Sequence, residues 1–547
     1  MKKLFIFSIL LYICISLYSQ TPQWQWAIRG GGSESDIGYC TAVDEEGNVY
    51  LAGEFTGTTT YGTTTMISRG WTDIYVAKIN ANHEWLWVRQ AGGTSEDRIF
   101  GMVLDPEGNV YVTGSYAETA QFSTTYITSY GNRDVFVAKL NGEGYLQWVT
   151  HAGGSHDDVG NSIAIDDSSN VYVTGFYYEE AVFGTHSLSG FGSYDIFVAK
   201  LDTSGTWLWV DGAGSSSGDK GNGIAVDHEG NSFVTGYFDG TAVFGPYSLT
   251  SYGRYDIFIA KLNRDGFLLG VFKAGGLGVD TGKAVALDEA GNLYFTGSYE
   301  ESIAFGPFIL TSQGGYDTFI AKMNSGAIYQ WARSAGGIGN DQPYGFCADH
   351  VGNTYVTGYF AGLSTFANIT LNSWGTADAY IAKLDANGYL GWAINVGGDQ
   401  VDIGMAISTD NQGYVYTTGM FSNSISFDNT TLTSVGGADT YLAKLYSGPV
   451  ANEDITFSVN TVSSLLFPIY PNPLYLGETA TIKASIIEGD KGILSIYNLK
   501  GQKIAEYSLS AGQHQISHDS SGLASGIYFC KLKTQTVEIV KKLVLYR

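Results

Sequence analysis

Seven aspartates recur at intervals of 61 residues without exception, and a set of carboxylates so regular raises the question of cation binding. Hard cations such as Ca²⁺ require several carboxylate or carbonyl oxygens. If the seven aspartates belong to copies of one structural unit, they form a ring on one face of the protein. The ring would consist of Asp36, Asp97, Asp158, Asp219, Asp280, Asp341 and Asp402.

Two interpretations of these aspartates remain open. Aspartates on separate units would lie too far apart for one ion, and no unit has the alternating D-x-D spacing of a calcium loop. An Asp side chain in a tight turn often accepts hydrogen bonds from backbone N–H groups. We therefore favour a structural role with no resident metal or cofactor, and calcium binding is the alternative.

No catalytic cluster stands out. The histidines are scattered and form neither a Ser-His-Asp arrangement nor an H-E-x-x-H motif. Adjacent acids such as Asp157 and Asp158 suit general acid–base chemistry. Neighbouring carboxylates in polar loops are usually solvated, however, so the sequence assigns no catalytic and no cofactor-binding residue.

Lysines, glycines and a second set of aspartates share the 61-residue period. A partly buried lysine needs a partner, so we expect each lysine to bond an aspartate of the Asp36 or Asp73 series. Recurrent glycines mark turns or close backbone approaches. The lysines are Lys78, Lys139, Lys200, Lys261, Lys322, Lys383 and Lys444. The glycines are Gly53, Gly114, Gly175, Gly236, Gly297, Gly358 and Gly419. The second aspartates are Asp73, Asp134, Asp195, Asp256, Asp317, Asp378 and Asp439.

A fixed period of this length indicates one supersecondary unit repeated seven times. In the third copy, four segments alternate apolar and polar residues with no helical stripe: 161–167, 170–177, 194–201 and 207–214. Turns such as DPEGN (105–109) separate the first two segments, and their glycine permits positive φ. Each unit is therefore predicted to be a four-stranded antiparallel sheet.

The types of strand at the beginning and the end of the repeat region predict a closed ring of seven sheets. The region begins with a fourth-type strand, Trp24–Arg29, and ends with a third-type strand, Asp439–Tyr446. No terminal copy differs enough to cap an open stack, and closure removes exposed ends. We predict that these two segments pair and close the ring.

Aromatic residues recur at three positions, exemplified by Phe55, Tyr61 and Trp87. They are expected to fill the wedges between neighbouring sheets, and sugar stacking is the alternative. The stretch between second and third strands, Glu54–Thr72 in the first copy, varies most. It would share a face with the Asp36 series, which makes that face the expected binding face.

Composition excludes several partners. The chain has 53 acidic and 29 basic residues, a net charge of −24, and the excess lies in the repeats. Such a surface repels nucleic acid and anionic membranes. Residues 1–19 indicate a secretory signal, and no segment of the mature chain is suited to span a bilayer. Cys40, Cys347 and Cys530 form neither a disulfide framework nor a zinc pattern.

The run "GNVYVTG", followed by "DxFVAKL" and a "W…GG" strand, resembles the SBBP family of β-propeller repeats. Seven matches in register cover about four fifths of the mature chain. The resemblance implies a seven-bladed β-propeller and, to our knowledge, no catalytic activity common to the family.

The C-terminal segment resembles the sorting domain of the type IX secretion system. Short alternating strands there predict a small β-sandwich. The resemblance rests on "LASGIYF" (523–529), "IYNLKGQKI" (496–504) and the residues Pro471, Asn472, Pro473, Gly501, Gly526, Lys541 and Lys542. It implies a Bacteroidetes-like host, the type IX machinery as partner, removal of this domain, and release or attachment to surface lipopolysaccharide.

These observations predict an all-β chain in four parts: signal 1–19, propeller 23–446, linker 447–466 and sorting β-sandwich 467–547. The expected function is a secreted or surface-attached, non-enzymatic scaffold that binds an extracellular glycan or protein. Two alternatives remain, a carbohydrate-active enzyme (glycosidase or lyase) on the variable face and a structural or adhesion component.

Overall fold

The computed structural model describes residues 22–410 and 412–448 and, in the C-terminal part, 465–466, 474–475, 479–486, 491–534 and 538–546. All regular elements in these ranges are β-strands, and none is a helix able to span a membrane. The chain divides into two compact units, Met1–Ala451 and Asn452–Arg547. The predicted signal, residue 411 and most of the predicted linker lie outside the described residues.

Each 61-residue copy folds into an antiparallel sheet of four strands in sequence order. The first strands are β2 (Asp36–Val43), β8 (Asp97–Leu104), β12 (Val159–Ile165), β16 (Lys220–Val226), β20 (Thr281–Leu287), β26 (Gln342–Ala348) and β32 (Asp402–Thr409). The second strands are β3 (Val49–Phe55), β9 (Val110–Phe122), β13 (Val171–Phe183), β17 (Ser232–Phe244), β21 (Leu293–Tyr299), β27 (Thr354–Phe360) and β33 (Tyr414–Phe421).

The third strands are β6 (Asp73–Ile79), β10 (Thr125–Leu140), β14 (His186–Leu201), β18 (Tyr247–Leu262), β24 (Asp317–Met323), β30 (Asp378–Leu384) and β36 (Asp439–Tyr446). The fourth strands are β7 (Trp85–Gly93), β11 (Leu146–Ala152), β15 (Trp207–Gly214), β19 (Leu268–Gly276), β25 (Tyr329–Gly337), β31 (Leu390–Val396) and, for the last copy, β1 (Gln23–Gly32). The turn after β2 forms as predicted, because the Asp44 carboxylate accepts the N–H groups of Glu46 and Asn48 and Gly47 has a φ of +79°.

Each copy contains a hairpin in addition to the four strands predicted from the sequence. The variable stretch between second and third strands forms a hairpin that hydrogen-bonds to the fourth strand of the preceding copy, as β4 does with β1. In copies two to four this hairpin is continuous with the long second and third strands. Elsewhere its strands are separate: β4 (Thr58–Tyr61), β5 (Thr64–Ile67), β22 (Ser302–Phe305), β23 (Phe308–Thr311), β28 (Leu363–Phe366), β29 (Ile369–Asn372), β34 (Ser424–Phe427) and β35 (Thr430–Thr433).

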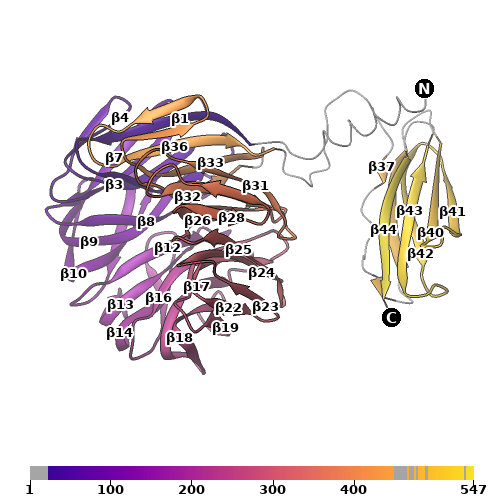
Figure 1. The fold of residues 1–547 in the computed structure, drawn as a ribbon. Coiled ribbons are helices and arrows are strands. Elements are labelled where there is room, and N and C mark those ends of the chain that lie inside the picture. The colour runs from indigo at the N-terminus through magenta and orange to yellow at the C-terminus, as the bar shows by residue number, and fades with distance from the viewer. Residues whose placement is uncertain are drawn as a thin grey trace. The chain divides into compact units, whose positions relative to one another are not determined.

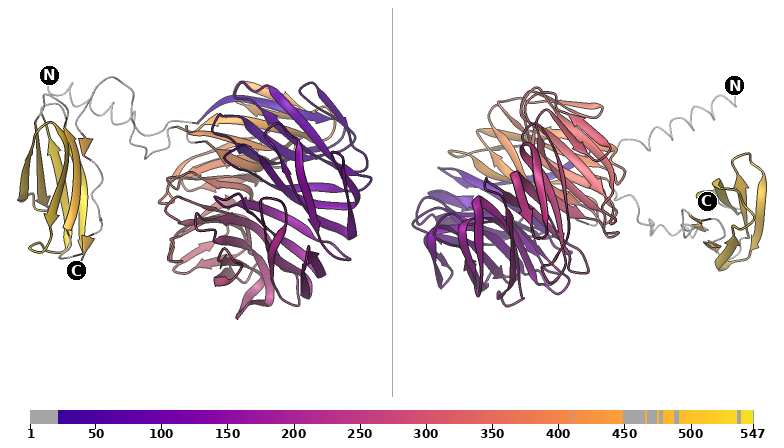
Figure 2. Two further views of the ribbon diagram at one scale, coloured as in Figure 1. Left: turned by 180° about the vertical axis from the view of Figure 1, so that it is seen from behind. Right: turned by 90° about the horizontal axis from the view of Figure 1, so that it is seen from below.

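The predicted pairing of the first and last strands of the repeat region is confirmed. β1 and β36 are antiparallel, with Ala27 opposite Ala443 and Ile28 opposite Leu442. The Arg29 guanidinium lies 2.5 Å from the Asp439 carboxylate across this pair. β1 and β36 lie side by side in Figure 1, and the indigo and orange strands remain adjacent from behind in Figure 2. We call this pair the seam.

The recurrent aromatic residues pack between copies, as expected. Phe55 and Tyr61 are fully buried, and the other members of both ring series are at most a few per cent exposed. Trp87 donates its indole N–H to the Gly142 carbonyl in the turn of the next copy, 3.1 Å away. Trp148 does the same with Thr203 at 3.0 Å. Each indole therefore fastens one sheet to the following one.

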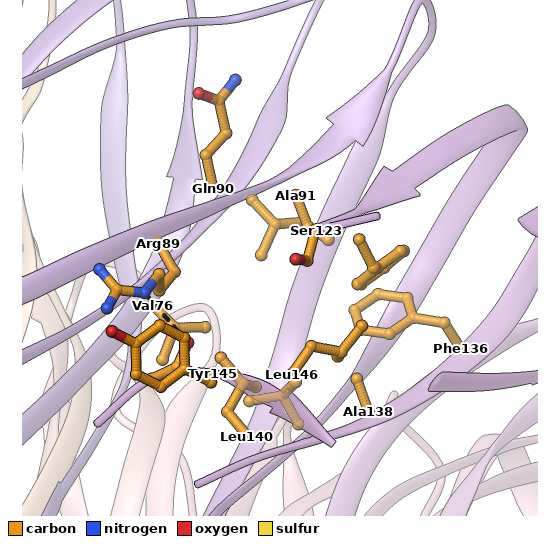
Figure 3. A pocket seen from close by; sticks show the side chains of 14 residues that line it. Val76, Arg89, Gln90, Ala91, Ser123, Phe136, Ala138, Leu140, Tyr145 and Leu146 are labelled. Atoms are coloured by element: carbon orange, nitrogen blue, oxygen red, sulfur yellow. Dashed lines mark hydrogen bonds between the residues drawn. The ribbon is translucent and has the colours of Figure 1, made fainter. Parts of the chain in front are cut away.

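One wedge is incompletely filled. A crevice of about 150 Å³ lies between the first two copies, with Leu146, Ser123 and Tyr145 around it (Figure 3). In the first copy the position of Leu146 is held by Trp85, whose ring contacts Tyr61 at 5.4 Å. A Cβ at Gly62 would come within 2.5 Å of that indole. The larger ring therefore requires glycine where the second copy has Ser123.

Filling this crevice is expected to stabilise the protein. The double variant Leu146→Trp, Ser123→Gly reproduces the Trp85–Gly62 arrangement and should raise the free energy of unfolding by about 1 kcal/mol. Thermal denaturation measures the change. Ser123→Gly alone is the matched control, and Leu146→Trp alone should gain less because the indole meets the serine Cβ. A double variant less stable than this control would contradict the packing argument.

The C-terminal unit contains two sheets. One has the order β37 (Leu465–Leu466), β39 (Thr479–Ile486), β42 (Gly512–Asp519), and the other β38 (Leu474–Tyr475), β44 (Glu538–Tyr546), β43 (Gly526–Lys533), β40 (Gly492–Asn498), β41 (Lys503–Leu509). Ile482 of the first and Leu494 of the second belong to one buried core. Gly501 has a φ of +77° in the turn after β40, Gly526 begins β43, and Lys541 and Lys542 lie on β44. Pro471, Asn472 and Pro473 lie outside the described residues.

Candidate functional site

The aspartates of the Asp36 series are buried acceptors for the backbone. The Asp97 carboxylate accepts the Gly93 N–H at 2.6 Å, and Asp341 accepts that of Gly337 at 2.8 Å. The same bond, four residues apart, occurs in all seven copies. Among the described residues no group of three or more His, Cys, Asp or Glu side chains is placed to hold a metal ion.

Each of these carboxyls lies near an Asp73-type carboxyl of the preceding copy. Burial raises the pKa of Asp97 to about 7, with a contribution from the charge of Asp73. Burial likewise raises the pKa of Asp341 to about 7, with a contribution from Asp317. Seven such pairs line the boundaries between copies, and we call them the carboxyl pairs.

The predicted partners of the repeated lysines are wrong. Lys78 lies 3.5 Å from Asp44, and Lys139 lies 3.7 Å from Asp105, so the partner is the aspartate of the turn after the first strand. The antiparallel register explains this, because Lys78 is opposite Tyr50 at the end of the sheet nearest this turn. Asp36 and Asp73 begin their strands at the other end.

These lysines also cover aromatic rings. Lys78 lies 4.7 Å from the ring centre of Tyr50, and Lys322 lies 4.7 Å from that of Tyr294. Equivalent contacts recur in the remaining copies. Their role is therefore structural, combining an ion pair with a cation–π contact.

Lys200 tests this arrangement best because its side chain is the most buried of the set. Its ammonium lies 3.4 Å from Asp166 and 4.6 Å from the Tyr172 ring centre. Lys200→Met should lower the free energy of unfolding by about 3 kcal/mol, because Asp166 loses its counter-charge. Chemical denaturation measures this, and adding Asp166→Asn should restore part of the loss. An unchanged midpoint in Lys200→Met would contradict the pairing.

The repeated glycines permit a bulge in the first strand. A Cβ at Gly53 would come within 1.9 Å of the Ile37 carbonyl oxygen, and one at Gly175 within 1.8 Å of that of Val159. The ladder between first and second strands shifts register there in every copy. Bulges re-aim side chains and are frequent beside functional sites.

The seven bulged residues converge on one cavity of about 300 Å³, lined by three successive residues from each of the seven first strands. The residue at this position varies among the copies: Tyr39, Phe100, Asn161, Asn222, Lys283, Tyr344 and Met405. We call this space the central cavity. Positions identical in all copies serve packing, whereas this one carries five residue types and lines a cavity, so it is the candidate functional site.

The cavity combines aromatic and amide groups. Tyr39 and Phe100 meet edge to face at 5.8 Å. The Asn161 amide donates to the Gly221 carbonyl of the next strand, and Asn222 donates to Gly282, both at 2.8 Å. These bonds fix the side chains, which therefore present pre-oriented polar groups to a ligand.

Charged groups stand beside the cavity. Tyr39 donates to the buried Glu54 carboxylate at 3.4 Å, and Arg98 lies 3.7 Å from both Glu54 and Glu96. Burial raises the pKa of Glu54, although Arg98 acts the other way. Arg133 binds Asp157 through two nitrogens, at 2.8 and 3.2 Å.

The expected binding face carries a second hollow, of about 470 Å³, bounded by Trp71, Glu96, Glu118, Arg133 and Asp157. Trp71 is 72% exposed. An exposed indole beside polar side chains suits a sugar ring. This hollow lies on the variable stretch identified from the sequence.

Sequence reasoning missed the cavity residues because it searched for positions that recur. The signal was the opposite one. The residue three positions after each Asp36-type aspartate is of five different types in the seven copies, although the position before it is glycine in five of them.

Comparison with known families agrees with this architecture. The description "Beta-propeller repeat" (SBBP) matches residues 86–115, 147–175 and 212–240. Three stretches within the first four copies therefore match a β-propeller repeat. Residues 468–546 match "Secretion system C-terminal sorting domain", so the protein is exported by the type IX system to the cell surface or the medium.

Two curated proteins are similar at 23% identity. One is an uncharacterized WD repeat-containing protein, L264, of Acanthamoeba polyphaga mimivirus, which aligns over 74% of this chain and 36% of its own length. The other is the regulatory protein FlaEY of Caulobacter vibrioides, over 60% and 37% respectively. The chain thus spans just over a third of the length of these relatives.

Solved structures resemble the chain only distantly. A fungal alcohol oxidase of the AA5 family, in complex with copper, has a TM-score of 0.38 at 12% identity and covers 96% of this chain and 100% of its own. A protein of unknown function from Bacteroides thetaiotaomicron has a TM-score of 0.31 at 12% identity, over 78% and 99%.

Proposed function

We propose that residues 23–446 form a closed seven-bladed β-propeller that acts, after export, as a non-enzymatic scaffold binding an extracellular glycan or protein in its central cavity. The observation that carries this is the convergence of seven bulged side chains, of five residue types, on one cavity. The β1–β36 pairing and the packing of β32 against β2 support closure.

The other parts of the chain fit this role. Residues 1–19 serve as the signal that begins export, residues 447–466 as the linker, and residues 467–547 as the sorting domain, which is removed in a Bacteroidetes-like host. The acidic repeat surface keeps the scaffold away from nucleic acid and anionic membranes. The hollow beside Trp71 offers an additional contact for an extended ligand.

A glycan array probed with the full chain, with and without calcium, tests the proposal. We expect a defined set of glycans to bind, and Tyr39→Ala or Asn161→Ala to weaken binding. Asn141→Ala, in a turn of the second copy outside the cavity, is the control. If neither the glycans on the array nor extracellular proteins bound, a structural or adhesion role would be favoured instead.

A carbohydrate-active enzyme is the second candidate, favoured by Glu54. Its equivalents in other copies are Ser115, Phe176, Tyr237, Ser298, Tyr359 and Met420, so a buried acid occurs here in one copy alone. A carboxyl whose pKa burial raises can act as a general acid. If the wild type released reducing ends from polysaccharides and Glu54→Gln did not, the enzymatic function would be established. If the wild type released none, the binding function would remain as the proposal.

A further inference from the structure

One lysine lines the central cavity of this strongly acidic protein, and a second lies nearby. The chain carries a net charge of −24, yet Lys283 lines the cavity and Lys220 lies two residues before the cavity residue Asn222. Within the described residues, no hydrogen bond or ion pair involves either ammonium group. The repeated lysines near the outer turns differ, because the first four lie within 4.0 Å of an aspartate.

Burying the ammonium groups of Lys220 and Lys283 without a bound anion is energetically unfavourable. Burial lowers the pKa of Lys283. Burial also lowers the pKa of Lys220; the charges of Arg133 and Lys283 act in the same direction, and that of Asp157 acts against them. A desolvated ammonium without a counter-charge is rare in a folded protein and is stabilised when an anion arrives.

The two arginines nearby are already occupied. Arg98 lies between Glu54 and Glu96, and Arg133 is held by Asp157. The groups left for an anion are therefore two primary ammoniums rather than a bidentate guanidinium. A lysine ammonium binds carboxylate and phosphate alike as a point charge, so the choice of anion rests on the groups around the two lysines.

The surroundings of these lysines suit a sugar ring. Lys220 lies 3.8 Å from the ring centre of Phe176 and 4.8 Å from that of Tyr194, and Lys283 lies 6.0 Å from that of Tyr344. The fixed Asn161 and Asn222 amides can bond hydroxyl groups. A volume of about 300 Å³ is at the small end of ligand pockets.

We propose that the central cavity binds a carboxylate-bearing sugar, a hexuronate unit of an acidic glycan, with its carboxylate between Lys220 and Lys283. This inference rests on the proposed binding function and names the ligand class. Tyr39, Phe100 and Tyr344, which line the cavity, stack on the ring, and the asparagines hold its hydroxyls. The acidic exterior excludes large polyanions, so a terminal unit is the fragment that enters.

Calorimetric titration of the full chain with galacturonate and glucuronate oligomers tests the proposal, in parallel with neutral galactose and glucose oligomers. Uronate oligomers should bind and the neutral ones should bind at least tenfold more weakly. Lys283→Met and Lys220→Met should each weaken uronate binding about tenfold to a hundredfold, the effect of losing one charged hydrogen bond. Lys283→Arg should retain most of the affinity.

Lys273→Met is the matched control because it removes an ammonium from the exposed rim of the same protein. Unaltered thermal unfolding of each variant shows that the fold persists. Equal binding of neutral and acidic oligomers, unaffected by Lys283→Met, overturns this inference and leaves the binding function standing. No binding of any carbohydrate overturns this inference and restricts the proposed binding function to a protein ligand. Equally tight binding of inorganic phosphate or sulfate overturns the sugar assignment.

Discussion

A chain that lacks residues 22–32 is expected to lose cooperative folding of the repeat region. Without β1 the last copy has no fourth strand, and the edge of β36 is exposed. Trp24 loses its edge-to-face contact with Phe427 at 4.8 Å, and Trp26 and Ile28 leave the core between the last and first copies. Each large apolar side chain contributes about 1.5–3 kcal/mol, so the total approaches the stability of a typical domain.

Thermal denaturation and size-exclusion chromatography measure this effect, and the expected result is a broad early transition with aggregation through the free edge. A cross-linked seam provides the converse experiment. Ala27 and Ala443 lie opposite one another, so Ala27→Cys with Ala443→Cys should form a disulfide. In the chain-entropy account the oxidised form gains about 6 kcal/mol, and reduction removes the gain. If the shortened chain melted at the same temperature as the wild type, β1 would not be the strand that closes the ring.

The protein is also expected to be more stable at pH 5 than at pH 8. Burial raises the pKa of Asp36 and Asp402 to about 7 and that of Asp158 and Asp280 to about 8. In the unfolded chain these carboxyls release their protons near pH 3.8. Between these values the folded state holds protons that the unfolded state has lost, so stability falls as pH rises towards 8.

One carboxyl shifted by about three pKa units corresponds to about 4 kcal/mol, and several carboxyl pairs act together. Aspartates such as Asp157, which a hydrogen bond from Arg133 holds at a lowered pKa, act in the opposite direction at lower pH. The melting temperature should therefore fall by several degrees between pH 5 and pH 8. Differential scanning calorimetry at constant ionic strength measures it, and a melting temperature that rises over this range would contradict the assignment.

A neutral isostere isolates the effect of one carboxyl pair. In Asp341→Asn the amide oxygen still accepts the Gly337 N–H, and the amide NH₂ can donate to Asp317. We expect this variant to be about 1–3 kcal/mol more stable than the wild type at pH 8 and equal to it at pH 5. Asp202→Asn is the control: slight desolvation opposes the shift, but hydrogen bonds from Ser204 and Thr206 lower its pKa. A loss of stability in Asp341→Asn at pH 8 would show that the carboxylate is needed charged.

The sequence predicted the strand pattern and the seam because both follow from local rules. Alternating residues such as those of 194–201 and turns such as DPEGN specify their strands with little help from tertiary contacts, and an invariant period specifies how the copies succeed one another. The missing fourth strand of the last copy left β1 as the available partner for β36. The packing role of Phe55 and Tyr61 followed from their recurrence.

The features that were missed depend on register and on contacts between copies. The partner of Lys78 is set by which strand end approaches the turn at Asp44, and sequence spacing alone does not reveal that. The hairpin β4–β5 is polar and short, so its pairing with the preceding copy leaves a weak pattern. The central cavity arises from a bulge forced by Gly53 and its equivalents, whose effect on Tyr39 is visible only in three dimensions.

The seam has a consequence for biosynthesis. Arg29 and Asp439 are 410 residues apart, so at about 5–20 residues per second the ribosome needs on the order of half a minute or more to deliver the second after the first. During that interval the partner strand of β1, β36, has not yet been synthesised, and the apolar side of β1 is uncovered. A chaperone that shields the nascent N-terminal strand until the last repeat emerges would therefore increase the fraction of chains that fold.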